Sequence, residues 1–74
     1  MSGIVSDIVF KQGVYVVHIG NRHACANRVV MNRILAWYGK ESPESLIGTR
    51  VRFEITGKKI LRECNEIYSV SQNT

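Results

Sequence analysis

The sequence predicts a mainly β protein with one helix, folded as a small antiparallel barrel or curled sheet. The order of the predicted segments, with two or three strands before a helix and two strands after it, favours this class. The first strands do not alternate between apolar and polar residues, which is typical of strands covered on both faces. We expect a single domain over residues 1–74, with the helix between the third and fourth strands.

The N-terminal strands are predicted from β-branched residues and from turns that contain glycine. The first strand runs from Gly3 to about Phe10, and Val14–Ile19 forms the second. Lys11-Gln12-Gly13 is the turn between them, where the glycine can take a positive φ. Gly20-Asn21 is a second turn, and Arg22–Ala26 follows as a short third strand.

The chain then changes to helical periodicity. Apolar residues at helical spacing predict a helix over Arg28–Tyr38, with Asn27 as its N-cap and Gly39 as its left-handed terminator. Trp37 follows Ile34 at this spacing, so we expect its indole to be buried. A Trp37→Ala substitution would then cost about 3–5 kcal/mol.

The C-terminal half is predicted to be a loop followed by a hairpin. Lys40–Leu46 is the loop, and Ser42-Pro43 can begin a single helical turn within it. Thr49–Ile55 alternates charged and apolar residues, which predicts a strand with one buried and one charged face. Thr56–Lys59 is the predicted turn into the last strand, Ile60–Val70.

The charge of the chain points to a polyanionic partner. Ten Lys and Arg residues against six Asp and Glu give a net charge of +4, and in a small domain such a balance favours nucleic acid. The alternative is that the charge only keeps the protein soluble. No segment resembles a signal peptide or a membrane span, so we expect a cytoplasmic protein without a membrane partner. The tail Ser71–Thr74 is expected to be disordered.

Two histidines and two cysteines are candidate zinc ligands. His18, His23 and Cys25 are spaced H-x4-H-x-C, with Cys64 as a remote fourth ligand. This spacing matches no closed zinc motif, so we predict no metal and no other cofactor. We expect both cysteines to be buried as free thiols, because disulfides are rare in the cell interior.

Catalytic motifs are missing from the sequence. There is no serine elbow, phosphate-binding glycine loop or HExxH motif, and the carboxylates form no evident acid–base pair. So small a barrel also leaves little room for a walled pocket of several hundred Å3. We therefore predict that the protein is not an enzyme.

Basic residues are the best candidates for a binding site. Arg50 and Arg52 should project from one face of a strand, with Lys58 and Lys59 in the adjoining turn. Such a surface attracts phosphates. The predicted nucleic-acid site is Lys11, Tyr15, Arg22, Arg50, Arg52, Lys58, Lys59 and Arg62.

Base stacking on aromatic side chains is the second requirement of a single-strand binder. Phe53 is predicted to face the core, and Phe10 is expected to be buried as well. Tyr15 therefore remains as the stacking candidate, with Tyr68 as an alternative.

Two segments carry a family resemblance. Gly3-Ile4-Val5, followed by Gly13-Val14-Tyr15-Val16, is similar to the opening hairpin of cold-shock domains. Gly48–Ile55 has the G-x-x-V-x-F-x-I pattern of their fourth strand. The chain thus resembles cold-shock domains and, more broadly, small OB-fold barrels such as ribosomal S1 repeats and bacterial translation initiation factor one. The resemblance implies an OB-like barrel, with a flat ββαββ sheet or an SH3-like barrel as the alternatives.

The stacking aromatics of cold-shock proteins are missing here. Their K-G-F-G-F and V-F-V-H-F segments correspond to Gln12–Val16 and to Arg28–Asn32, which has no aromatic residue. The resemblance therefore implies the scaffold but not the binding residues. Two functions stay open: non-catalytic binding of single-stranded RNA or DNA, or a protein-binding adaptor or inhibitor. Either could pair through exposed strand edges as a homodimer.

Overall fold

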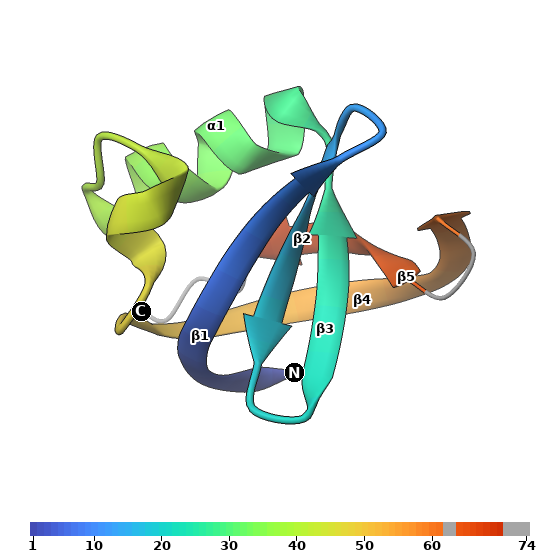
Figure 1. The fold of residues 1–74 in the computed structure, drawn as a ribbon, viewed down its shortest axis with the longest axis horizontal. Helices are drawn as coiled ribbons and strands as arrows, with labels where there is room; N and C mark the ends of the chain where they lie inside the picture. The colour runs from blue at the N-terminus through green and yellow to red at the C-terminus, as the bar shows by residue number, and fades with distance from the viewer. Residues whose placement is uncertain (62–63, 71–74) are drawn as a thin grey trace.

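The computed structural model describes residues 1–61 and 64–70, with side chains up to residue 67. The protein is mainly β with one α-helix, as predicted (Figure 1). Arg62, the side chain of Tyr68 and the tail Ser71–Thr74 lie outside the described residues. The elements in chain order are β1 (Ser2–Lys11), β2 (Val14–Ile19), β3 (Arg22–Ala26), α1 (Arg28–Tyr38), the 3-10 helix η1 (Pro43–Leu46), β4 (Arg50–Leu61) and β5 (Cys64–Val70).

The strand pairings close the sheet on itself. The order is β1-β2-β3-β5-β4, and β4 pairs back to β1. Four of these pairings are antiparallel, and the pairing of β3 with β5 is parallel, through Cys25 and Glu66. In Figure 1, β1, β2 and β3 lie in front of β4, with the end of the β4–β5 hairpin to the right of β3.

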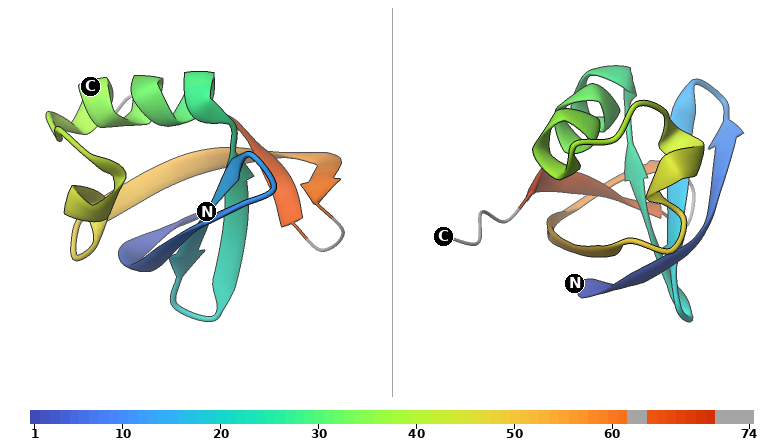
Figure 2. Two further views of the ribbon diagram at one scale, coloured as in Figure 1. Left: turned by 45° about the horizontal axis from the view of Figure 1, so that its top comes forward. Right: turned by 90° about the vertical axis from the view of Figure 1, so that its left-hand side faces the viewer.

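The main core fills the inside of the closed sheet. Helix α1 lies across one end of the sheet (Figure 2) and buries Met31, Ile34 and Leu35 in this core. The remaining buried core residues come from every strand and from η1: Val5, Val17, Ile19, Ala24, Ala26, Leu46, Val51, Phe53 and Ile67.

Local sequence signals account for the turns and the helix ends. Gln12 and Gly13 both have positive φ, 53° and 82°, as a two-residue hairpin turn between β1 and β2 requires. The Asn27 side chain accepts the Val30 N–H at 2.8 Å, and Gly39 ends α1 in the left-handed region, as predicted. The helical turn expected at Ser42-Pro43 is η1.

The predicted turn over Thr56–Lys59 is wrong, because β4 continues to Leu61, which pairs with Cys64. The extra residues are absorbed as irregularities in the β4–β5 register between Ile55 and Leu61. The Asn65 side-chain amide donates to the Thr56 carbonyl at 3.0 Å and holds the strands together there.

Two aromatic residues that were expected to be buried are exposed. Trp37 is 43% exposed, since it lies about 120° around the helix from Met31, outside the buried stripe. Tyr38 packs on the core instead, and its hydroxyl accepts the Arg52 N–H at 2.9 Å. Phe10 is 49% exposed near the end of β1, beyond the part of the strand that faces the core.

Candidate functional site

A cleft of about 600 Å3 lies on the outer face of β1, β2 and β3. Successive side chains of a strand point to opposite faces. Val17 and Ile19 point into the core, so Val16 and His18 face outward, and His23 faces outward next to them on β3. The cleft is lined by Val9, Lys11, Gln12, Val16, His18, His23, Leu61 and Cys64.

The hairpin end, defined here as Ile60 and Leu61 of β4 and Cys64 of β5, contributes Leu61 and Cys64 to one wall of the cleft. A second hydrophobic cluster, the outer cluster, consists of Val16, Cys25 and Cys64, with Ile60 and Leu61 packed against it. This packing covers the outer side of β2 and β3. The cleft lies outside the core and is partly open to solvent, so it is not the walled pocket for which we expected little room.

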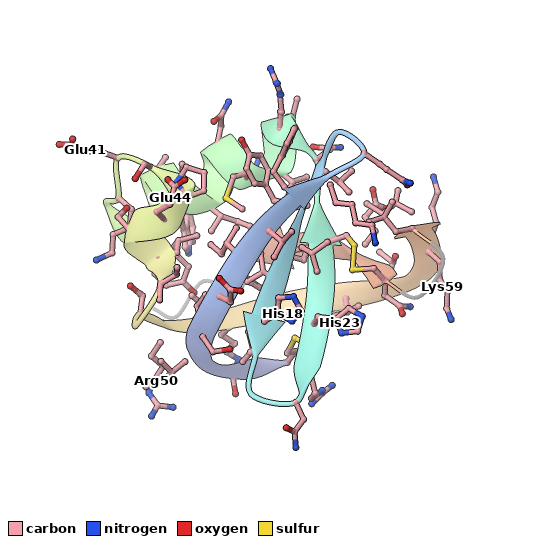
Figure 3. All side chains as sticks on the ribbon, viewed as in Figure 1. His18, His23, Glu41, Glu44, Arg50 and Lys59 are labelled. Carbon is pink, nitrogen blue, oxygen red and sulfur yellow. A yellow bond between two sulfur atoms is a disulfide. The ribbon has the colours of Figure 1, made fainter. Side chains whose placement is uncertain are left out.

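Cys25 and Cys64 form a disulfide in the outer cluster, which corrects the expectation of free thiols (yellow bond in Figure 3). Both are buried, as predicted. The pairing follows from the topology: Cys25 is the partner of Glu66 in the parallel pairing, and Cys64 lies two residues before Glu66. The two Cα atoms are 5.7 Å apart, within the usual span of about 4.4–6.8 Å for a disulfide.

His18 and His23 form the polar centre of the cleft. They are register partners on β2 and β3, both half-buried, with ring centroids 5.7 Å apart (Figure 3). Asp7 pairs with His18 from β1, and its carboxylate accepts the Ile8 N–H at 2.9 Å. Over residues 1–61 and 64–67, no group of three or more His, Cys, Asp or Glu side chains could hold a metal ion.

The predicted basic residues fall into two groups. Lys11 lines the cleft, and Lys58 and Lys59 are exposed on β4 just before Leu61, another lining residue. Arg22 is exposed at the start of β3, next to His23. Arg50 and Arg52 are exposed at the other end of β4, where they pair with Ile4 and Ser2.

Arg50 and Lys59 lie at opposite sides of the molecule in Figure 3. They are nine positions apart on β4, a path of at most about 30 Å along the strand at 3.3 Å per residue. Among the described residues, the predicted basic face is therefore not one surface: Lys11 lines the cleft and Lys59 lies near it on β4, whereas Arg50 and Arg52 lie at the far end of that strand.

Tyr15, the predicted stacking residue, lies at one end of the sheet rather than in the cleft. Its ring packs partly on the core and contacts Phe10, with centroids 4.7 Å apart. The Arg28 guanidinium lies 5.7 Å from the centroid of Phe10, a cation–π contact. These side chains form a small aromatic group near the start of α1.

The sequence indicated His18 and His23 only as candidate zinc ligands, not as neighbours in a cleft. A signal existed in β2, where Val16 and Val17 are both apolar and therefore require cover on both faces. What lies over the outer face depends on the path of the β4–β5 hairpin, which local patterns do not give.

Comparison with protein-family models, curated proteins and solved structures finds no match for this chain. Within the part of the chain that the structure describes, no helix is long and apolar enough to cross a membrane.

Proposed function

We propose that the closed sheet is an OB-like barrel that binds single-stranded nucleic acid in the cleft, without catalysis. Two features support the barrel type: the parallel pairing of β3 with β5 and the helix between β3 and β4. OB barrels bind oligonucleotides on the face of strands 2 and 3 and on the flanking loops. The observation that carries the proposal is a cleft on this same face with basic residues at its edge.

The cleft and its edge offer side chains that can contact the phosphates and the bases of a nucleic acid. Lys11 is positioned to contact phosphates, and Lys59 extends the positive charge along the hairpin. His18 and His23 offer imidazole rings, which stack on unpaired bases as other aromatic rings do. The volume of about 600 Å3 lies within the range of about 300–1,000 Å3 for ligand sites.

Fluorescence anisotropy with a labelled single-stranded oligonucleotide tests the proposal at two salt concentrations. The variant K11E/K59E reverses two charges beside the cleft, and R50E/R52E is the matched control with the same change in net charge. We expect K11E/K59E to weaken binding at least about tenfold and to reduce the salt slope by about two, since each phosphate contact contributes about one. R50E/R52E should stay within about threefold of wild type.

Two results would contradict this assignment. Loss of binding in R50E/R52E alone would move the site to the far end of β4. No binding by the wild-type protein at low salt, where phosphate contacts are strongest, would reject nucleic acid as the ligand.

A second candidate function, a protein-binding adaptor, is favoured by the exposure of Trp37. Arg33 is also exposed, one helical turn before Trp37, and Trp and Arg are common anchors of protein interfaces. A pull-down from nuclease-treated lysate tests this function. A specific partner that K11E/K59E retains and W37A loses would support it, whereas equal retention by both variants would count against it.

A further inference from the structure

We propose that the Cys25–Cys64 disulfide is a redox switch that controls the shape of the cleft, so that a dithiol reductant regulates binding there. The identity of the ligand, single-stranded nucleic acid, rests on the proposed function. The structural part, release of the hairpin end on reduction, stands on the fold alone.

The disulfide lies beside a strand pairing that has little backbone ladder. β3 and β5 share one register pair in the described residues, Cys25 with Glu66, whereas β2 and β3 share five. The covalent bond joins the two strands at this place. With so little backbone pairing beside it, the contact between the two strands depends on the crosslink and on side-chain packing.

The same bond holds the hairpin end over the outer face. Cys64 is both a lining residue of the cleft and a member of the outer cluster, where Ile60 and Leu61 pack. The β4–β5 register is irregular between Ile55 and Leu61, and the hydrogen bond from the Asn65 side chain to the Thr56 carbonyl replaces part of the ladder there. An irregular ladder lowers the free-energy cost of local opening, so the disulfide and the packing of the outer cluster carry more of the stability of this segment.

The cleft gives a reductant its route to the disulfide. Cys25 and Cys64 are both buried, at 0% and 3% exposure, but Cys64 lines the cleft, so local opening of the hairpin end exposes its sulfur first. A thiolate of a dithiol therefore attacks Sγ of Cys64. The Sγ–Sγ bond breaks, and its electron pair leaves with Cys25, whose thiolate then takes up a proton. The second thiol of the reductant resolves the mixed disulfide, which frees Cys64 and leaves the reductant as a disulfide after a two-electron exchange.

This chemistry also couples the bond to the ligand. Leu61 and Cys64 line the cleft, so release of the hairpin end on reduction removes part of its wall and should weaken oligonucleotide binding. By linkage, a bound oligonucleotide should shift the equilibrium of the cysteine pair toward the disulfide.

Residue-resolved amide hydrogen exchange by NMR tests the structural part, comparing the air-oxidised protein with the protein reduced by dithiothreitol. We expect the amides of residues 58–61 and 64–66 to exchange at least about tenfold faster after reduction, while Val17 and Phe53 in the main core stay unchanged. The variant C25S/C64S should match the reduced protein.

Three results would overturn the switch. Equal exchange in both states would show that the bond does not hold the hairpin end. Faster exchange throughout the core would show that the bond stabilises the whole fold and does not act only on the hairpin end. Alkylation of both cysteines in the unreduced, unfolded protein would show that the bond does not form.

Anisotropy with the labelled oligonucleotide, in the presence and absence of dithiothreitol, tests the regulatory part. We expect reduction to weaken binding at least about fivefold, the lower end of typical coupling between sites. Equal binding in both states would overturn the regulation but leave the proposed function intact. No binding in the oxidised state would reject the proposed function and with it the regulation of that ligand, while the exchange experiment still decides the structural part.

Discussion

Val16 and Val17 are neighbours in the chain but are buried in different hydrophobic clusters, on opposite faces of β2. Val17 lies in the main core inside the closed sheet, and Val16 lies in the outer cluster under the hairpin end. This strand is therefore covered on both sides, which explains why its sequence shows no alternation.

The two valines should contribute to different parts of the structure. Val17→Ala removes two methyl groups from the main core and should lower the free energy of unfolding by about 2 kcal/mol. Val16→Ala should cost less, about 1 kcal/mol, since the outer cluster can relax with the hairpin end. Urea unfolding measures both values. A larger loss for Val16→Ala would show that the outer cluster, not the inside of the sheet, dominates stability.

Trp37 should behave as a surface residue. Because its side chain is 43% exposed, the emission of the indole should lie close to that of solvent-exposed tryptophan and be quenched readily by acrylamide. Trp37→Ala should cost about 1 kcal/mol of unfolding free energy, well below the 3–5 kcal/mol of a buried indole. A blue-shifted emission that resists quenching would contradict the exposed position.

Gly3 should tolerate no side chain. Its φ is +153°, and an added Cβ would lie 2.7 Å from Cγ2 of Ile19. Gly3→Ala should therefore destabilise the protein by about 2 kcal/mol or more, through backbone strain and displacement of a core side chain. Gly57→Ala is the matched control, since a Cβ there meets nothing within 4 Å. Thermal melting of both variants measures the difference, and equal melting temperatures would argue against the close approach at Gly3.

Local signals predicted the parts of the fold that depend on neighbours in sequence. The Asn27 cap, the Gly39 terminator and the alternation of Arg50, Val51, Arg52 and Phe53 all appear as expected. Each is decided within a few residues, by a capping hydrogen bond, a left-handed backbone or the two faces of a strand.

Features that depend on distant segments could not be predicted in this way. The disulfide joins cysteines 39 residues apart, and it forms because the closed sheet brings β3 and β5 side by side. The cleft exists because Ile60 and Leu61 of β4 pack against Val16 and the disulfide on the outer side of the sheet, a contact between segments far apart in sequence. Phe10 and Trp37 are apolar residues at the ends of elements, where the core no longer covers them.

The closed sheet combines strand pairings that are local in sequence with pairings that are distant, and this difference predicts an order of folding. Two-residue turns join β1, β2 and β3, so contacts among these strands are local. Closing the ring instead joins β1 to β4, where the Met1 ammonium donates to the Phe53 carbonyl across 52 residues of chain. Such pairings carry a loop-closure entropy cost before they gain any contact. We therefore expect the segment from Ser2 to Ala26 to lead folding, with the rate set by the later arrival of β4 and β5.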